Sequence, residues 1–316
     1  MAFQQPVRAA IAALAFVLVS SGDCVSALAA SDVGGPQVAE NPVVLGPATS
    51  DTTPVDALQS SPFIVSLPRR VPPFPIVLNQ SVQRYVREFL NHPAGLQLCF
   101  ERSNPYLGEM VRILRSHSLP DDIIYLAFAE SAFSSTGRGP WQFSATTARR
   151  YGLRIDSWVD ERRDPILSTR AAAQHLAELH DAAGDDWWIA LAGWNIGETA
   201  IDRYKSLSGR EYTKFASHLP LRTRKLMNRF MAVAFIANNA PAYGIGPAKS
   251  VEPPIFHTVP VNGGAKLATV AKSHGTTVAR LKQLNPALLR DSIPARVESY
   301  EIRVPLFESA STSAAL

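Results

Sequence analysis

The chain has 316 residues, which is enough for one sizeable hydrophobic core and a smaller additional module. With 46% hydrophobic and 18% charged residues it has the composition of a globular protein, which excludes a chain that is disordered throughout. The formal net charge of +4 suits an anionic environment such as a cell envelope. No basic run with interleaved aromatic residues is present, so a nucleic-acid partner is not expected.

The amino terminus has the pattern of a secretory signal. Arg8 precedes an apolar stretch over residues 9–19, which is followed by polar residues and then by Ala27, Leu28 and Ala29. The apolar stretch is shorter than the roughly 20 residues that span a bilayer, so we expect a cleaved signal peptide over residues 1–30. Export would place the protein in the periplasm or cell envelope.

Lipid attachment at Cys24 is the alternative reading of the amino terminus. Asp23 stands directly before Cys24, where a small residue is usual, so lipidation is the minority hypothesis. Membrane association is expected only if Cys24 is lipidated. If Cys24 leaves with the signal, Cys99 is the remaining cysteine, which allows no internal disulfide and suits a core position.

Residues 31–73 are rich in Pro, Ser and Ala and lack periodicity, which predicts a disordered linker. Beyond them, apolar residues recur at helical spacing, and residues 74–246 are predicted to form an all-helical domain. We expect helices at 81–90, 106–116, 119–133, after Ser144, after Ser168, at 187–194 and at 223–238. Ser144 and Ser168 are the predicted caps.

Glycine and proline residues break the helical pattern at 244–254, which marks a domain boundary. The pattern beyond it predicts a strand at 256–261, helices at 267–274 and 278–284, and a strand at 300–304. Residues 255–307 therefore read as a small βααβ module. The expected fold class is mainly α, with a helical domain followed by this module.

Glu130 closes an apolar run over residues 123–129, in which the Tyr125 hydroxyl is the one polar group. A helix that is apolar all round is buried, so Glu130 should lie at the wall of a core. Burial raises the pKa of a carboxyl group, as a general acid near neutral pH requires. The alternative is a structural acid paired with an arginine.

Two stretches, 139–143 (GPWQF) and 192–198 (AGWNIGE), place polar side chains beside aromatic ones. Aromatic rings can stack on sugars, and amides can hydrogen-bond to hydroxyl or acetamido groups. The candidates for such contacts are Trp141, Gln142, Tyr151, Trp194 and Asn195. Core packing is the alternative for both tryptophans.

Metal and cofactor chemistry find little support. The histidines show no paired spacing with carboxylates, and His175 and His180 do not share a helical face well. We find no glycine-rich phosphate loop and no nucleophile elbow. The residues therefore indicate an enzyme without cofactor or metal, or a binding protein.

Several motifs occur together in an order that resembles family 1 lytic transglycosylases, over roughly residues 75–244. They are Glu130-Ser131, Gly139-Pro140-Trp141-Gln142, Tyr151-Gly152, residues 160–165 (DERRDP) and residues 192–198. The carboxyl-terminal module resembles a LysM domain through residues 256–259 (FHTV), 275–278 (GTTV) and 284–286 (LNP).

The resemblance implies a lysozyme-like helical fold. It also implies an enzyme that cleaves peptidoglycan glycan strands between N-acetylmuramic acid and N-acetylglucosamine. Glu130 would first protonate the glycosidic oxygen and then deprotonate the muramic acid C6 hydroxyl, giving a 1,6-anhydro product. Ser131, Gln142 and Asn195 would orient the acid or the substrate. The implied substrate-binding residues are Ser131, Trp141, Gln142, Tyr151, Trp194, Asn195 and Glu198, with Gly264, Ala265 and Pro286 in the LysM-like module. A monomer is expected.

This chain departs from the family pattern in several places. Trp194 stands where the family has tyrosine. An indole can donate but not accept a hydrogen bond, so the sequence leaves open whether the residue at this position contacts Glu130. The 132–140 loop is shorter than usual, and residues 264–267 lack the usual helix cap. The alternatives are a hydrolytic muramidase, or a peptidoglycan-binding or scaffold protein without catalysis. Glu198 is the other acid within a motif and reads equally well as a loop-stabilising residue.

Overall fold

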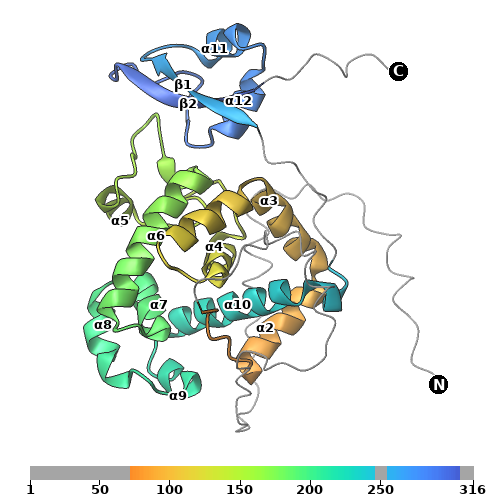
Figure 1. Ribbon diagram of the computed structural model, residues 1–316, viewed down its shortest axis with the longest axis vertical. Coiled ribbons are helices and arrows are strands. Elements are labelled where there is room, and N and C mark those ends of the chain that lie inside the picture. Colours follow the sequence, from red (N-terminus) through yellow and green to blue (C-terminus); the bar gives the residue numbers. More distant parts are fainter. Residues whose placement is uncertain (1–71, 246–254, 307–316) are drawn as a thin grey trace, which may run out of the picture. The chain divides into compact units, whose positions relative to one another are not determined.

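The computed structural model describes residues 72–245 and 255–306. The predicted signal peptide, Cys24 and residues 31–71 of the predicted linker lie outside the described residues. Residues 72–245 are helical, and residues 255–306 contain both strands and two short helices (Figure 1). None of the helices in these two described ranges is both long and apolar enough to cross a membrane.

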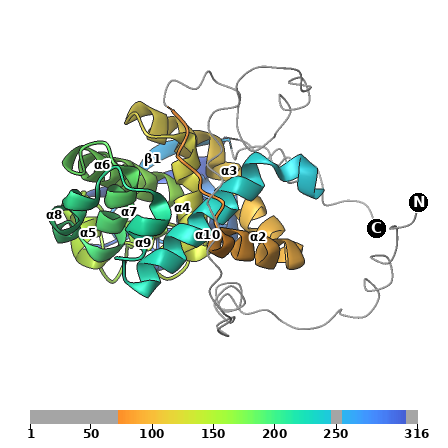
Figure 2. The ribbon, with the colours of Figure 1, turned by 90° about the horizontal axis from the view of Figure 1, so that it is seen from below.

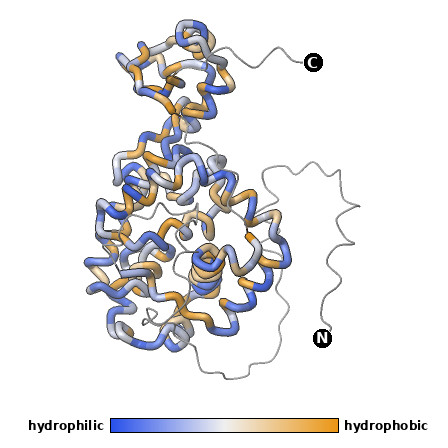
Figure 3. The backbone as a smooth tube through the Cα atoms, turned by 45° about the vertical axis from the view of Figure 1, so that its right-hand side comes forward, coloured by the Kyte–Doolittle hydropathy of each residue, from blue (hydrophilic) through white to orange (hydrophobic). Residues whose placement is uncertain are grey.

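The helices before residue 240 include the predicted ones in the predicted order, with differences at their ends, and two short helices at 199–204 and 212–216 that were not predicted. They are α2 (Gln80–Asn91), α3 (Pro93–Ser116), α4 (Ile124–Ser131), α5 (Ala145–Arg150), α6 (Pro165–Ala182), α7 (Trp187–Ile196), α8 (Thr199–Tyr204), α9 (Tyr212–Ala216) and α10 (Leu221–Asn238). Short 3-10 turns lie at Asp121–Ile123, Glu161–Arg163, Lys205–Leu207 and Ala240–Tyr243. The tube in Figure 3 alternates between hydrophobic and hydrophilic residues along most of these helices, as helices that bury one face do.

Helix α4 packs against α10 and α3 (Figure 2). Residues 124–129 are at most 3% exposed, which confirms that this helix is buried on all sides. The helix ends where Ala132 adopts a left-handed conformation with φ of 51°. Glu130 therefore lies in its last turn, where the side chain is partly exposed.

Two acids hold the start of α4. Asp122 is fully buried and accepts hydrogen bonds from the backbone N of Phe74 at 3.0 Å and from Asn238 Nδ2 at 2.8 Å. Asp121 forms a bidentate pair with Arg115, with both distances 2.7 Å. These contacts tie α4 to the preceding segment, to α3 and to the end of α10.

Some helix boundaries predicted from sequence are wrong. Helix α3 starts at Pro93 rather than at residue 106, because Pro105 is accommodated inside the helix. Helix α6 is capped by Asp164, whose Oδ1 accepts from the backbone N of Ile166 and of Leu167, at 2.9 Å each. Ser168 instead lies in the first turns, where its hydroxyl donates to the Asp164 carbonyl at 2.6 Å. Ser144 caps α5 as predicted.

The carboxyl-terminal module has the predicted strand, helix, helix, strand order. Strand β1 (Phe256–Asn262) and strand β2 (Ser299–Pro305) are antiparallel, with Phe256 opposite Pro305. Helices α11 (Leu267–Ser273) and α12 (Val278–Leu284) lie between them in the chain. Lys266 precedes α11 without a side-chain cap, as the sequence suggested.

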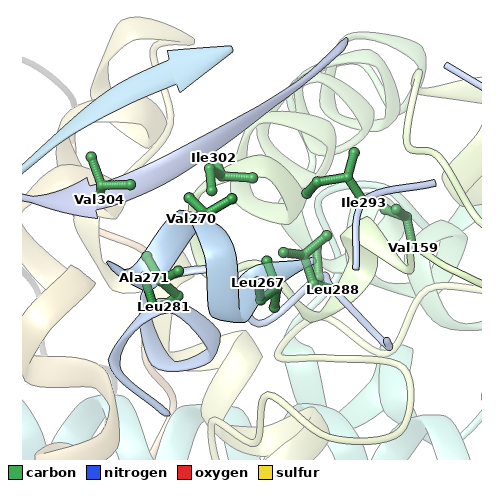
Figure 4. Close-up of a cluster of buried hydrophobic side chains, with 10 residues drawn as sticks. Val159, Leu267, Val270, Ala271, Leu281, Leu288, Ile293, Ile302 and Val304 are labelled. Atoms are coloured by element: carbon green, nitrogen blue, oxygen red, sulfur yellow. The ribbon is translucent and has the colours of Figure 1, made fainter. Parts of the chain in front are cut away.

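The module has its own hydrophobic cluster, drawn in Figure 4. Ile302 and Val304 of β2 belong to this cluster together with residues of α11 and α12. Val159, from the segment between α5 and α6, belongs to the same cluster and is fully buried. The next residue, Asp160, donates its backbone N–H to the Ala287 carbonyl at 2.9 Å.

Candidate active site

A cleft of about 500 Å³ brings most of the sequence-predicted residues together. Among them, the following line it: Glu130, Trp141, Gln142, Trp194, Asn195 and Glu198. Ser131 and Tyr151 do not line the cleft. Ser131 follows Glu130 in the chain, and Tyr151 contacts His175, and both of these neighbours line the cleft. Arg138, Arg150, His175 and Arg222 also line the cleft and were not predicted as site residues.

Glu130 and Trp194 are hydrogen-bonded across the cleft wall. Trp194 Nε1 donates to Glu130 Oε1 at 3.0 Å, which answers whether an indole at this position reaches the acid. Because the indole N–H can only donate, Oε1 must act as an acceptor. We therefore assign the proton of protonated Glu130 to Oε2, which leaves Oε1 as the carbonyl acceptor.

Burial raises the pKa of the Glu130 carboxyl, and this effect outweighs several opposing ones. The hydrogen bond from Trp194 lowers the pKa, as do the positive charges of Arg222, Arg229 and Arg138. The net shift is upward, in the direction that the apolar run of α4 predicts. A carboxyl with a raised pKa keeps its proton to higher pH, as a general acid must.

Trp194 is fixed by neighbouring rings. Its ring centre lies 5.9 Å from that of Trp141, 5.1 Å from Phe143 and 5.3 Å from His175. Trp141 is 1% exposed and donates its Nε1–H to Thr169 Oγ1 at 2.9 Å, so its indole is committed to packing. Trp194 is partly exposed and leaves part of its ring open to the cleft.

Ser131 ties the 132–140 loop to α4. It is 2% exposed, and its Oγ donates to the Pro140 carbonyl at 2.9 Å and accepts from the Ser134 N–H at 3.1 Å. A buried hydroxyl engaged in this way is not positioned to touch a ligand directly. The residue is better described as holding the loop that carries Gln142.

Gln142 has an unusual backbone conformation, with φ of 53°. Its Nε2 donates to the Gly139 carbonyl at 2.7 Å, which orients the side-chain amide and leaves its oxygen as an acceptor at the cleft. The Asn195 side chain is held through its amide oxygen, whereas that of Gln142 is held through its amide nitrogen. Its Oδ1 accepts from Thr223 Oγ1 at 2.8 Å, which leaves its Nδ2 as a donor.

Gly139 allows the loop to pass close to the turn at Glu161–Arg163. Its φ is 73°, and a Cβ there would lie 1.8 Å from the Arg162 carbonyl oxygen. Arg162 in turn donates Nη1 to the Phe143 carbonyl at 3.0 Å. The DERRDP segment therefore supports the loop that forms one wall of the cleft.

Tyr151 does not line the cleft, and its hydroxyl is engaged by two neighbouring side chains. Its hydroxyl donates to Glu178 Oε2 at 2.7 Å and lies 2.7 Å from His175 Nδ1. Burial lowers the pKa of His175 to about 4, so the imidazole is neutral near pH 7. Because the single hydroxyl proton goes to Glu178, we assign the imidazole proton to Nδ1, donating to the Tyr151 oxygen.

Glu198 is exposed and forms an ion pair with Arg150. Arg150 also approaches Glu178, with 3.9 Å between Nη2 and Oε2. The second acid of the cleft is therefore paired with a cation and solvated. Its surroundings differ from those of Glu130, which is flanked by an indole donor.

The module residues proposed from the LysM resemblance do not line this cleft. Gly264 is exposed with φ of 79°, while Ala265 and Pro286 are partly buried. Ala265 packs against the hydrophobic cluster of the module. Among the described residues, the possible ligands of a metal ion gather at His180, Asp181 and Asp185, which do not line the cleft.

The unpredicted residues in and around the cleft left weak signals in the sequence. His175 and Glu178 are three residues apart on α6, a spacing that places them on one face. Arg138 lies on the 132–140 loop, which follows Glu130 in the chain. Arg222 and Arg229 belong to α10, and their approach to Glu130 depends on the packing of α10 on α4, which no local pattern encodes.

The fold and this cleft define a mainly helical protein whose cleft holds an acid of raised pKa beside aromatic and amide side chains, followed by a βααβ module. Comparison with known families agrees with this class. Residues 113–215 match the family described as "Transglycosylase SLT domain", and residues 255–316 match "Lytic transglycosylase MltD, LysM-like domain". The chain therefore carries an SLT domain and an MltD-type LysM-like domain.

The chain is homologous to membrane-bound lytic murein transglycosylase D of Escherichia coli (strain K12). The two are 26% identical over 237 residues, which cover 72% of this chain and 52% of the relative. The protein of the same name from Escherichia coli O6:H1 gives the same values. The chain spans about half the length of these curated relatives.

Proposed function

We propose that this protein is a lytic transglycosylase that cleaves peptidoglycan between N-acetylmuramic acid and N-acetylglucosamine and leaves 1,6-anhydromuramic acid ends. The observation that carries the proposal is Glu130, a carboxyl with a raised pKa in the cleft of an SLT domain. The names of the relatives point to the same reaction on murein.

In the first step, Oε2 of Glu130 donates its proton to the glycosidic oxygen. The bond between this oxygen and C1 of the muramic acid then breaks, and N-acetylglucosamine leaves with the proton as its 4-hydroxyl group. Positive charge develops on the ring as the bond breaks. The hydrogen bond from Trp194 stabilises the carboxylate that Glu130 becomes.

In the second step, the same carboxylate takes the proton of the muramic acid C6 hydroxyl. The C6 oxygen attacks C1 and closes the anhydro ring, and Glu130 recovers its proton. Neither water nor a second acid is consumed. One carboxyl therefore serves as acid and then as base, which suits a cleft with one enclosed carboxyl.

The surroundings of Glu198 favour this reaction over hydrolysis. Most hydrolytic glycosidases use a second carboxylate as nucleophile or as the base that activates water. Glu198 is exposed and paired with Arg150, so its charge is already balanced. We assign it to shaping the cleft and not to the chemistry.

The remaining assignments follow from the contacts. We propose that Gln142 and Asn195 bind the sugar hydroxyl or acetamido groups, that Trp194 offers a ring face, and that Trp141, Ser131 and Tyr151 hold these groups in position. Gly264, Ala265 and Pro286 remain the proposed sugar contacts of the LysM-like module.

For the whole chain, we propose a signal peptide at 1–30, a linker at 31–73, the SLT domain at 74–246 and the LysM-like module at 255–307. The proposed location is the periplasm or cell envelope, and the proposed partner is the peptidoglycan glycan strand. Membrane attachment would follow only if Cys24 is lipidated, which the mass of the mature protein tests.

The mass of the released muropeptides tests the reaction. Purified sacculi treated with the protein should give products that are lighter by one water than those of a hydrolytic muramidase. Products with an added water would replace the proposal with hydrolysis. Binding to sacculi without cleavage would instead support a scaffold role.

A further inference from the structure

A second hollow, which we call the α10 pocket, adjoins the cleft at Glu130. It has a volume of about 390 Å³ and lies between the end of α4, Asn195 and the amino-terminal half of α10. Glu130, Asn195 and Arg222 line both the cleft and the pocket. A glycan bound across Glu130 therefore has the α10 pocket within reach of its substituents.

The α10 pocket is positively charged. Arg222, Lys225 and Arg229 line it, and their spacing of three and four residues places them along one face of α10. Glu130 is the one acid among the lining residues. With Glu130 protonated, as the first step requires, the lining residues themselves carry no negative charge.

Among the residues that line the α10 pocket, Arg229 has a guanidinium whose Nε is buried and makes no hydrogen bond within the described part of the chain. Burial lowers the pKa of the Arg229 guanidinium, while the neighbouring Tyr85, Glu130 and Glu88 raise it. A guanidinium offers a planar fork of donors that suits the two oxygens of a carboxylate.

We propose that the α10 pocket is a subsite for a carboxylate carried by the glycan, held by Arg222 and Arg229. This rests on the proposed function, because a muramic acid residue bears its lactyl side chain next to the bond that is cleaved. The carboxylate is either the free lactyl group of a peptide-free sugar or an acid of an attached stem peptide. A neutral glycan offers neither group.

Filling this subsite also acts on the catalytic acid. Arg222 and Arg229 both lower the pKa of Glu130 in the free protein. A bound carboxylate offsets their charge, so the pKa of Glu130 rises when the substrate is in place. The acid is then held protonated at the moment when its proton is needed.

Binding measurements on the full chain carrying Glu130→Gln test the subsite without turnover. The probes are peptide-free glycan strands, strands with stem peptides, and a neutral oligomer of N-acetylglucosamine. Adding Arg222→Gln or Arg229→Gln should weaken binding of a carboxylate-bearing strand about tenfold or more, as expected for a lost charge-assisted contact. Binding of the neutral oligomer should not change.

The matched control is Arg203→Gln, which removes an exposed cation on α8 that lines neither hollow. It should bind all three probes like the parent. If the arginine variants bind only peptide-free strands more weakly, the bound group is the lactyl carboxylate. If they bind only peptide-bearing strands more weakly, the bound group is an acid of the stem peptide. A selective loss on both supports a pocket that accepts either acid.

The proposal is overturned if the arginine variants lose affinity equally for charged and neutral probes, or for none. If the parent binds no probe at all, the proposed function itself fails. Should Arg229→Gln not fold, Arg222→Gln and the salt dependence of the parent decide. Added salt should weaken binding of the charged strands and leave the neutral oligomer unaffected.

Discussion

Trp194 donates its indole N–H to Oε1 of Glu130 at 3.0 Å. This bond joins the acid at the end of α4 to the carboxyl-terminal part of α7, and it is the reason for assigning the proton of Glu130 to Oε2. The ring of Trp194 is in turn held by Trp141, Phe143 and His175. The orientation of the acid therefore depends on an aromatic cluster.

Replacing Trp194 by phenylalanine keeps a ring and removes the donor. Because this hydrogen bond lowers the pKa of Glu130, the pKa should rise in Trp194→Phe, and the alkaline limb of the pH profile of kcat should move to higher pH. The loss of a hydrogen bond to a charged group should reduce kcat about tenfold or more. Trp194→Tyr restores a donor and should recover part of both effects. An unchanged pH profile would show that the bond does not tune the acid.

Lowering the pH should destabilise the fold through His175. Its pKa falls from 6.5 to about 4 on folding, so the unfolded chain binds this proton more readily than the folded one does. Above about pH 6.5 the imidazole is neutral in both states, and the free energy of unfolding is at its full value. As the pH falls from about 6.5 toward 4, the free energy of unfolding decreases by an amount on the order of 3 kcal/mol. Denaturant unfolding of wild type and His175→Gln at several pH values isolates this slope. Equal slopes in the two proteins would contradict the assignment.

Gly139→Ala should destabilise the wall of the cleft. The new Cβ would meet the Arg162 carbonyl oxygen at 1.8 Å, in a backbone conformation with φ of 73°. We expect a loss of unfolding free energy of about 2–4 kcal/mol from the clash and strain together. Gly137→Ala is the matched control, because Gly137 also has a positive φ of 57° but has open space at its Cβ. It should cost only about 1–2 kcal/mol for the left-handed backbone. Equal losses would show that the close approach to Arg162 is unimportant.

Asp122→Ala should weaken the anchoring of α4. The substitution leaves the buried N–H of Phe74 and the partly buried amide of Asn238 without their acceptor, and the buried donor alone should cost about 1–3 kcal/mol. Asp202→Ala, at an exposed position of α8, should stay within about 0.5 kcal/mol of wild type. Thermal and denaturant unfolding provide the measurement. A loss no larger than that of Asp202→Ala would refute the anchoring role.

The sequence predicted the features that local patterns encode. The apolar run before Glu130 indicated a buried helix with an acid at its wall, and both are observed. The order of the elements in the carboxyl-terminal module was also predicted. The cap of α6 was misplaced at Ser168, because the helical spacing of later residues outweighed the signal of Asp164 followed by proline.

Contacts between distant segments could not be predicted in the same way. Whether Trp194 reaches Glu130 depends on the approach of α7 to α4, and the positive charge around the acid depends on α10. Tyr151 was expected to meet a sugar, yet its hydroxyl is committed to His175 and Glu178. Most residues that the sequence motifs singled out line one cleft, while the partners of each side chain could be found only in the packed helices.

The most direct test of the account is muropeptide release from purified sacculi by Glu130→Gln, compared with Glu198→Gln. Both substitutions remove one acid from the lining of the cleft, but only Glu130 is assigned to proton transfer. We predict that Glu130→Gln remains folded and releases no anhydro-muropeptides, while Glu198→Gln keeps substantial activity. Undiminished release of anhydro products by folded Glu130→Gln would contradict the central claim.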